Sequence, residues 1–579
     1  MKASDLIALK LAEYSDYVFS GQGGSVVHIL DSLSKRDGIK IVPAQNEQGA
    51  SLAADAYSRT SGKLGIVVTT SGPGTINALQ GLACSYYDSI PALYISGAPV
   101  RGALKKNKKM RQLGFQEMDI QEIVKSFTKY STRIIDVNKI FYAIDKCVFL
   151  AREGRPGPCI IDLPDDIQRM ETSSEEQEIF KPEIKKLILE PKKIEEVTRM
   201  VAVSKRPIFI VGNGVKISES KKAIDELLKK TQIPYAATWA TFDMFRSDDS
   251  QNIGGFGVYA TRHGNFAIQN SDLLIILGSR LNGTLIGSNA KLFAPKAKKI
   301  QIDIDPAELN EENNLQIDLK INCDVKEFIT TLNNKQIKWQ LNQSWLDKIQ
   351  QLKKKYPIIK EEYFNQKKLV NPYIFFDTLS NYTSENDIII PDASANLVWA
   401  YQAYKVSKKQ KIFTALNHSP MGYSVAAAIG ACLGSPRNNI IAIIGDGAMQ
   451  MNIQELENIK NLKLPIKMFL INNSGYGMVK QTIDTWLDSR YVGCDESSGL
   501  SLPNFQKVSK SYGIETVEIN NHNDLKEKIE QTLNYKGPLL CDVKLDPNEK
   551  IIPKVKAGSP IHNMLPALSD DEIKSNMIE

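Results

Sequence analysis

The sequence lacks the features that mark secreted, zinc-binding and membrane proteins. Its seven cysteines in 579 residues are scattered, odd in number and never in CxxC spacing, which argues against a disulfide framework and a zinc site. No apolar run is long enough to cross a bilayer, so we expect no membrane partner. The first apolar stretch contains acids, unlike a signal peptide. We therefore expect a cytoplasmic protein with reduced cysteines in its core.

Extremes of charge are also missing. The net charge of +6 is small for this length and the lysines are spread along the chain, so nothing supports nucleic acid as a partner. One basic cluster stands out, "RGALKKNKKMR" at 101–111. It has two interpretations, a solvated loop or a rim that attracts an anion. A hydrophobic content of 42% with 24% charged residues is typical of a globular protein.

Apolar runs and helix-period segments alternate along the chain, which predicts the α/β class with parallel sheets. The clearest expected strands are "LGIVVTT", "ALYISGA", "RPIFIVGNG", "SDLLIILGSR", "DIIIPDASA" and "NIIAIIGDG". The alternation recurs in three blocks that polar, charged segments separate. We expect three doubly wound parallel-sheet domains in series, at residues 1–175, 190–340 and 365–550, followed by a C-terminal tail at 551–579.

Polar groups end two of the expected strands in the third block. One apolar run ends in Gly445-Asp446-Gly447, and a second run, 24 residues later, ends in Asn473 and its neighbour. Ligands of parallel sheets bind at the carboxyl ends of the strands. Glycines and a helix expected from about Ala448 would favour a diphosphate there, and carboxylate and amide oxygens suit Mg²⁺. Each motif alone also fits a simple turn, but the pair at this spacing is more specific.

This pair, GDG and NN 24 residues apart, resembles the diphosphate and magnesium motif of thiamine diphosphate enzymes. The segment "NEQGASLAADAYSRTSGKLGIVVTTSGPGTINALQG" is similar to the pyrimidine-binding domain of the acetolactate synthase family. The similarity extends through "LGFQEMDIQEIVKSFTKY", "GRPGPCIIDLP", "IQIDIDPAEL" and "SPMGYSVAAAIGA", so it covers nearly the whole chain. It implies a pyrimidine-binding, a central and a diphosphate-binding domain.

The resemblance also implies the site. Glu47, in "AQNEQGA", matches the glutamate that activates the cofactor through its aminopyrimidine ring, although an acid there would also complement a helix dipole. Met421 matches the apolar wedge under the cofactor, although alone it would be core filler. The magnesium ligands become Asp446, Asn473 and the carbonyl of Gly475. Other residues that match cofactor-lining segments are Gly72, Gly74, Asn77, Phe115, Gln116, Gly445, Gly447, Ala448, Tyr476 and Met478.

The reaction implied is decarboxylation of a 2-oxo acid such as pyruvate, with transfer of its acyl carbanion to a second carbonyl. No histidine stands beside Glu47 or near residue 115, which favours carboligation over release of an aldehyde. The two cofactor-binding halves lie about 400 residues apart, and in this family they meet between subunits. We therefore expect a homodimer or homotetramer.

Two departures from the family bear on the acceptor substrate. The family has phenylalanine, two aspartates and arginine where this sequence has Leu281-Asn282-Gly283-Thr284, so the carboxylate-binding arginine is missing there. The family tryptophan after "MVRQ" is Thr482. These changes suit a larger, neutral acceptor such as a nucleotide-linked keto sugar. His418 would then be a candidate proton donor, with a structural histidine as the simpler interpretation.

A flavin is a further open question. "GNG" at 212–214, Arg280 and the segment 303–305 resemble parts of the FAD site of acetolactate synthases, but GxG without a third glycine is weak evidence for a dinucleotide. A flavin-using oxidase and a non-catalytic relative remain as alternatives to the carboligase. The presence of Glu47, Asp446 and Asn473 counts against the non-catalytic one.

Overall fold

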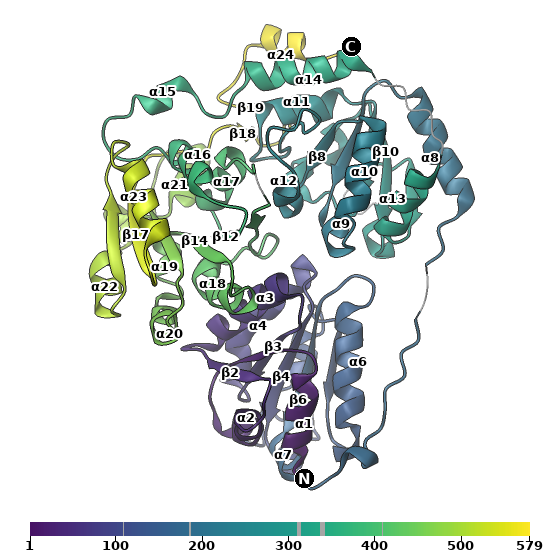
Figure 1. Cartoon of the computed structure of the whole chain (residues 1–579), viewed down its shortest axis with the longest axis vertical. Helices are drawn as coiled ribbons and strands as arrows, with labels where there is room; N and C mark the ends of the chain where they lie inside the picture. Colours follow the sequence, from purple (N-terminus) through teal and green to yellow (C-terminus); the bar gives the residue numbers. More distant parts are fainter. Residues whose placement is uncertain (108, 185–186, 310–313, 336–341, 408, 579) are drawn as a thin grey trace.

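Three parallel sheets form the framework of the chain in a computed structural model (Figure 1). The structure describes residues 1–578 except 108, 185–186, 310–313, 336–341 and 408. The first sheet, at the bottom of Figure 1, has the order β2-β1-β3-β4-β6-β5. Its strands are β1 (Tyr17–Ser20), β2 (Lys40–Pro43), β3 (Gly65–Thr69), β4 (Ala92–Ala98), β5 (Tyr130–Arg133) and β6 (Pro158–Pro164).

Helices cover both faces of this first sheet, as the doubly wound prediction requires. One face packs on α1 (Ala3–Ala12), α2 (Val27–Ser34), α6 (Ile140–Arg152) and α7 (Asp165–Arg169). The other face packs on α3 (Glu47–Ser61) and α4 (Pro73–Asp88). All residues of β3, β4 and β6 are buried, which explains why they appear in the sequence as continuous apolar runs.

The second sheet has five strands in the order β11-β10-β9-β7-β8. They are β7 (Pro207–Val211), β8 (Tyr235–Ala237), β9 (Leu273–Leu277), β10 (Lys298–Asp303) and β11 (Leu319–Asn322). One face packs on α8 (Pro191–Val203), α10 (Lys221–Thr231) and α13 (Val325–Asn334). The other packs on α11 (Arg262–Asn270), α12 (Gly283–Ile286) and α14 (Gln343–Lys355).

The third sheet repeats the topology of the first, in the order β13-β12-β14-β15-β17-β16. Its strands are β12 (Asp387–Pro391), β13 (Lys411–Ile412), β14 (Asn439–Gly445), β15 (Lys467–Asn472), β16 (Glu515–Ile519) and β17 (Leu539–Lys544). Helices α16 (Pro372–Tyr382), α17 (Ala395–Ala403) and α23 (Leu525–Asn534) cover one face. Helices α18 (Tyr423–Gly434), α20 (Leu456–Asn461) and α22 (Phe505–Ser511) cover the other.

The predicted α/β class with three doubly wound parallel sheets is therefore confirmed. The exact domain limits remain predictions. One segment that we expected to separate two domains and another that we expected to be a tail both contain secondary structure. The polar stretch after residue 333 contains α14, whose Trp345 and Ile349 are buried against the central sheet. Residues 551–578 form β18 (Lys554–Val555), β19 (Met564–Leu565) and α24 (Asp570–Asn576).

The C-terminal segment returns to the central domain rather than extending into solvent. Arg262 of α11 donates hydrogen bonds to the carbonyl oxygens of Met564 (3.4 Å) and Pro566 (2.7 Å). Asn270 donates to the carbonyl oxygen of Asn576 (2.8 Å). In Figure 1 the end of the chain lies above the central sheet, next to α14. Within the described part of the chain, no helix has the length and apolar character needed to span a bilayer.

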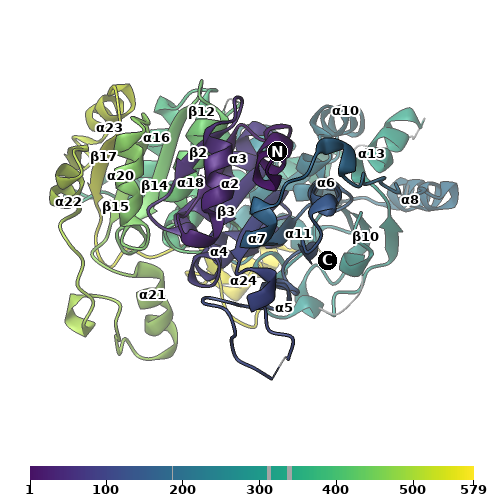
Figure 2. The same cartoon turned by 90° about the horizontal axis from the view of Figure 1, so that it is seen from below.

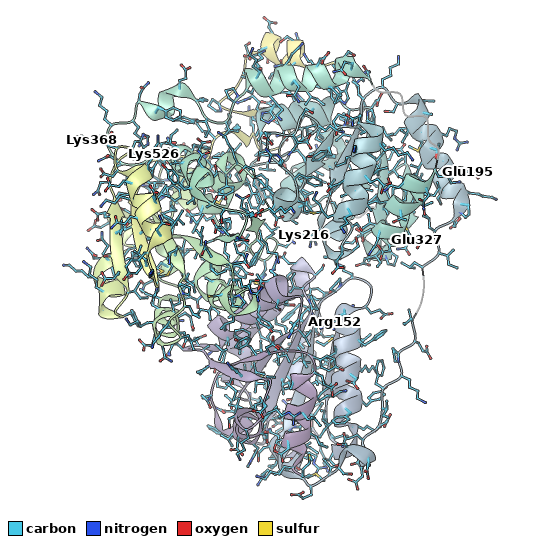
Figure 3. All side chains as sticks on the ribbon, viewed as in Figure 1. Arg152, Glu195, Lys216, Glu327, Lys368 and Lys526 are labelled. Carbon is cyan, nitrogen blue, oxygen red and sulfur yellow. The ribbon has the colours of Figure 1, made fainter. Side chains whose placement is uncertain are left out.

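The first and third domains share one hydrophobic core, in which α3 and α18 lie side by side (Figure 1). A Cβ atom on Gly430 of α18 would stand 1.8 Å from the carbonyl oxygen of Ala53 in α3, so the helices touch backbone to backbone. The central domain also contacts the third sheet. Lys216, labelled in Figure 3, pairs with Asp243 at 2.7 Å, and this carboxylate accepts the N–H of Ile412 (3.0 Å). The three domains are therefore in direct contact.

Candidate active site

In the third sheet, the strand order reverses between β12 and β14. The predicted metal residues Asp446 and Asn473 lie near this reversal, at the carboxyl ends of β14 and β15. Asp446 begins α19 (Asp446–Met449), directly after β14 and two residues earlier than the helix start that we expected. One carboxylate oxygen accepts the N–H of Gly447 (2.7 Å) and the other accepts the N–H of Gly475 (3.1 Å). Gly475 follows Asn473 at the end of the neighbouring strand β15. The structure therefore brings the three predicted metal ligands to one edge of the sheet.

The electrostatics of Asp446 suit a cation. Its side chain is 2% exposed, and burial raises the pKa of its carboxyl to about 6, although the surrounding backbone N–H groups favour the charged form. Among the described residues no basic side chain forms an ion pair with Asp446. Nor do these residues contain a cluster of three His, Cys, Asp or Glu side chains for a metal. A hard divalent ion held by carboxylate, amide and carbonyl oxygens fits this donor set.

Three predicted cofactor residues meet beside Asp446. A Cβ atom on Gly447 would stand 2.1 Å from the ring of Tyr476 and 3.4 Å from the methyl group of Met421. Only glycine fits between these side chains, and its bare backbone is left facing the end of the sheet. Ala448 is buried next to it, and Met478 packs against the core from α21 (Gly477–Trp486). This cradle of small residues fits the diphosphate group of the expected cofactor.

Two residues that no motif indicated complete this half of the site. Asp392, which follows β12, is 0% exposed and accepts the N–H groups of Gly422 (3.0 Å) and Ser424 (2.8 Å). It thereby caps α18 and holds the end of the loop that carries Met421. Asn396 of α17 is buried, and a Cβ atom on Gly445 would come within 2.9 Å of its amide nitrogen. Both side chains follow β12, the strand expected in "DIIIPDASA", and the sequence alone did not show that this strand pairs with β14.

The pyrimidine-binding half forms at the carboxyl ends of β1, β2 and β3. Glu47 is the first residue of α3, and its carboxylate accepts a hydrogen bond from the amide of Asn77 (3.0 Å). A Cβ atom on Gly21 would stand 2.5 Å from Glu47 Oε1, and one on Gly74 would stand 3.1 Å from it. The carboxylate is therefore held in a narrow space between glycine backbones, half-buried and without a basic partner among the described residues.

The segment predicted to cover the reacting end also lies in this half. Gly72, with φ +64°, lies so close to Gln116 that a Cβ atom would meet its carbonyl oxygen at 2.8 Å. Gln116 itself has a positive φ of 58°. The neighbouring Phe115 is 86% exposed. In Figure 2 the segment that precedes α5 (Ile120–Val124) projects from the first domain.

Among the described residues, the hydrogen bonds that join the first and third domains do not involve Glu47 itself. Asp55 of α3 accepts a hydrogen bond from Tyr423 (2.6 Å), beside the Met421 loop, and Glu47 lies eight residues before Asp55, about 12 Å along the helix axis. In the described part of the chain, no hydrogen bond joins Glu47 to Asp446, Asn473 or the Met421 loop. The third domain does reach the start of α3, because Glu455 accepts the N–H of Asn46 (3.2 Å).

His418 and the basic cluster at 101–111 make contacts with other protein groups that need no role in catalysis or anion binding. The His418 ring stacks on Tyr87, with centroids 5.8 Å apart and planes 12° apart. This contact fits the structural interpretation of His418. In the basic cluster, Lys105 donates from its side chain to the carbonyl of Arg111 (3.1 Å), and Lys108 lies outside the described residues. An anion-binding role for the cluster stays a prediction.

The residues predicted for FAD are engaged in contacts between protein segments. Gly212 and Gly214 pack on the backbone of Gly278, where a Cβ atom would stand 2.3 Å and 2.8 Å from its atoms. These glycines therefore allow the loops that follow β7 and β9 to pack backbone against backbone. Asn213 donates to the carbonyl of Asp88 (3.3 Å), and Asp305 pairs with Arg155 at 3.1 Å. A flavin at these residues stays a prediction.

Comparisons with known proteins agree with this geometry. Three family profiles match the chain: "Thiamine pyrophosphate enzyme, N-terminal TPP binding domain" over residues 1–123, its central domain over 194–332 and its C-terminal TPP binding domain over 392–543. The acetolactate synthase large subunit of Porphyra purpurea is 32% identical over 561 residues, which cover 95% of this chain and 92% of the relative. The chain belongs to the acetolactate synthase family of thiamine pyrophosphate enzymes.

Further relatives place the whole chain in this family. Acetolactate synthase 1 of Nicotiana tabacum, a chloroplastic protein, is 32% identical and covers 97% of this chain and 85% of the relative. The large subunit of Lactococcus lactis subsp. lactis is 31% identical, with 98% of this chain and 97% of the relative covered. As a member of the acetolactate synthase family, the chain is a thiamine diphosphate-dependent enzyme, as its motifs predicted. Glu47 lies in the N-terminal match, and Asp446 and Asn473 lie in the C-terminal match.

Proposed function

We propose that the chain is a decarboxylating carboligase, which removes CO₂ from pyruvate and joins the remaining acyl unit to a second carbonyl compound. The observation that carries the proposal is Asp446, a buried carboxylate next to Gly447 whose hydrogen-bond partners among the described residues are backbone N–H groups. The names of the relatives, all acetolactate synthases, support the choice of pyruvate as donor. When bound, thiamine diphosphate supplies a carbon nucleophile and an electron sink for the loss of CO₂.

Different residues of the chain would bind the metal and the cofactor, hold a proton and exclude water. Asp446, Asn473 and the carbonyl of Gly475 would hold Mg²⁺, and the backbone at Gly445 and Gly447 would receive the diphosphate. Met421 would support the cofactor from below. Glu47, kept in place by Asn77 at 3.0 Å, would hold a proton at the ring nitrogen of the aminopyrimidine. Phe115 and Gln116 would exclude water from the reacting end.

We also propose that two copies of the chain form the active site, with Glu47 from one and Asp446 from the other. In the described part of the chain, no hydrogen bond joins Glu47 to Asp446, Asn473 or the Met421 loop, which supports this arrangement. Large apolar side chains are exposed on both projecting segments: Phe115 is 86% exposed, Val492 78% and Trp486 64%. In Figure 2 the segment before α5 and the segment around α21 project toward the same edge of the molecule. A second copy would cover these side chains.

We propose that Gly212, Gly214 and Asp305, which resemble parts of a FAD site, serve contacts between protein segments instead. A flavin absorbance band in the purified protein would contradict this. We further propose a reducing compartment such as the cytoplasm, which the seven cysteines support because all are buried and free.

The experiment that tests the reaction is incubation of the protein with ¹³C-labelled pyruvate, thiamine diphosphate and Mg²⁺. We expect release of labelled CO₂ and a product whose mass contains the remaining two labelled carbons joined to a second carbonyl compound. Release of acetaldehyde alone, or uptake of oxygen with formation of acetate, would contradict carboligation. The matched control is the Asp446→Asn protein, which should form no product.

A further inference from the structure

A buried carboxylate stands directly beside the residues that would cover the reacting end of the cofactor. Glu117 follows Phe115 and Gln116 in the chain, and its side chain is 8% exposed, whereas that of Phe115 is 86% exposed. In the part of the chain that the structure describes, no basic side chain forms an ion pair with Glu117. A buried charge without a basic partner needs other hydrogen-bond donors.

These donors are backbone N–H groups from two parts of the same loop. Glu117 Oε1 accepts the N–H of Lys105 in the basic cluster (2.6 Å). Glu117 Oε2 accepts the N–H of Leu113 (2.7 Å) and, at a longer distance, that of Gly114 (3.4 Å). Burial alone would raise the pKa of the Glu117 carboxyl, but these N–H groups hold it below its usual value. The charged carboxylate therefore joins the basic cluster to residues 112–117, which we call the cover segment.

The cover segment rests on an anchored part of the first domain. Gly114 is buried, and a Cβ atom there would stand 2.8 Å from the carbonyl oxygen of Ala103 and 2.9 Å from the side chain of Pro99. Between these two residues, Arg101 donates from Nε to Asp166 (2.7 Å), which follows β6. The base of the loop is thus fixed to the sheet, and Glu117 ties the cover segment to it.

Glu117 also closes the turn that contains Phe115 and Gln116. Its own N–H donates to the carbonyl oxygen of Gly114 (3.1 Å). Within this turn Gln116 has a φ of +58°, a conformation that residues other than glycine adopt only when their surroundings hold them there. The carbonyl oxygen of Gln116 lies against Gly72, where a Cβ atom would meet it at 2.8 Å. The contacts of Glu117 therefore keep Gln116 in place beside Gly72.

The product of the proposed reaction depends on how well this cover excludes water. When the bond between the two carbonyl carbons of pyruvate breaks, CO₂ leaves and the electron pair stays on the remaining two-carbon unit. A proton from water forms the C–H bond of acetaldehyde and leaves hydroxide, whereas attack on a second carbonyl forms the C–C bond of the ligated product. Exclusion of water slows the first of these two competing steps.

We infer that Glu117 is a positioning residue that holds the cover segment over the reacting end and thereby favours carboligation over release of acetaldehyde. The inference rests on the proposed function, including the cover role of Phe115 and Gln116, and adds the residue that determines the product. Glu117 acts through the backbone of the cover segment and touches no reacting atom.

The substitution Glu117→Gln tests the carboxylate with almost no change in volume. An amide offers one oxygen and one NH₂ group, so in either orientation its NH₂ group would face the N–H of Lys105 or of Leu113, and at least one hydrogen bond is lost. Glu122→Gln removes the same charge at an exposed position and is the matched control. Gly114→Ala is a second route to the same displacement, because its methyl group would meet the Ala103 carbonyl.

The first measurement is hydrogen–deuterium exchange of the full-length protein without cofactor, read by mass spectrometry. We expect the N–H groups of Lys105 and Leu113 to exchange about 10-fold faster or more in Glu117→Gln, the loss typical of a hydrogen bond to a charged group. Glu122→Gln should exchange as the wild-type protein does. Thermal unfolding of each variant shows whether it is folded.

The second measurement uses the full-length protein with thiamine diphosphate, Mg²⁺ and saturating ¹³C-labelled pyruvate, and compares the amounts of labelled acetaldehyde and CO₂. We expect the ratio of acetaldehyde to CO₂ to rise about 10-fold or more in Glu117→Gln, as the loss of one charge-assisted hydrogen bond implies. Gly114→Ala should raise the ratio as well, and Glu122→Gln should keep the wild-type ratio.

Several outcomes would overturn the inference. These are wild-type exchange rates in folded Glu117→Gln, an equal rise of the ratio in Glu122→Gln, or a fall of CO₂ and both products together at an unchanged ratio, which would show a merely structural role. If Glu117→Gln does not fold, the ratio in Gly114→Ala decides alone. A wild-type protein without CO₂ release or without ligated product would overturn the proposed function and the inference with it. Ligated product in the wild type, together with any of the earlier outcomes, would overturn the inference alone.

Discussion

The part of the candidate site that was easiest to predict from the sequence consists of single residues at the ends of β14 and β15. Asp446, Gly447 and Asn473 stand directly after apolar strands, so a parallel sheet had to bring them to one edge. Asp392, Asn396 and their contacts could not be predicted in this way. They lie in no motif, and their place depends on β12 pairing with β14 across about 50 residues of sequence, as the strand register shows.

At this scale we expect Asp446→Asn to abolish tight binding of Mg²⁺ with thiamine diphosphate. Loss of a direct ligand should weaken binding by more than the roughly 10–100-fold that follows loss of an outer partner. Titration calorimetry with the metal and cofactor together measures the effect. Asp488→Asn, at an exposed position that is not part of the site, is the control. Wild-type affinity in Asp446→Asn would contradict the metal assignment.

At the scale of elements, the contact of α3 with α18 connects the first and third domains. Gly430 touches the backbone of Ala53, and Tyr423 donates to Asp55. The sequence predicted both helices from their neighbouring strands, but not that they share one core. The reason is that the small residues of "SVAAAIGA" fit a buried helix in any environment. Only their packing partner decides which surface they cover.

We expect Gly430→Ala to destabilise the protein by about 1–3 kcal/mol, because its methyl group would enter the space of the Ala53 carbonyl. The better helix propensity of alanine, about 1 kcal/mol, offsets part of this. Thermal unfolding with Gly102→Ala as control checks the effect, since a Cβ atom on Gly102 meets nothing within 4 Å. Equal melting temperatures for the two variants would show that the helices are not in close contact.

The start of α3 should respond to pH through Glu455. Burial raises the pKa of this carboxyl from 4.5 to about 7, although hydrogen bonds from Asn458 and Asn46 favour its charged form. The folded chain therefore keeps a proton that the unfolded chain loses above pH 4.5, so this group lowers stability as pH rises from 4.5 to about 7.

Glu455→Gln should remove this contribution. We expect the variant to gain up to about 3 kcal/mol relative to the wild-type chain between pH 5 and pH 7.5, as the shift in pKa implies. The measurement is denaturant unfolding of both proteins over that pH range. Parallel stability curves for the two proteins would show that Glu455 titrates normally.

At the scale of the whole molecule, the central question is how two distant halves form one site. The sequence placed Glu47 and Asp446 about 400 residues apart, and within the described part of the chain no hydrogen bond joins them. The order of the helices and strands could be predicted from the sequence. The contact surface between subunits could not, because the sequence does not show which apolar side chains, such as Trp486 and Val492, lie on the surface.

Mixing two inactive variants tests the assembly. Glu47→Gln and Asp446→Asn each damage one half, so a mixed dimer would contain one intact site. With random exchange of subunits we expect about a quarter of wild-type activity, because half of the dimers are mixed and each has one working site. The double variant mixed with either single variant is the control and should stay inactive. No recovery in mixtures that contain mixed dimers by mass would place both residues of each site on one chain.

The most direct test of the account is the rate at which bound thiamine diphosphate exchanges its C2 hydrogen for deuterium in the Glu47→Gln protein. Loss of a positioned acid–base group should slow the exchange by about 100-fold or more, while cofactor and Mg²⁺ still bind at wild-type stoichiometry. Exchange at the wild-type rate in that protein would contradict the role of Glu47 and the site built around it.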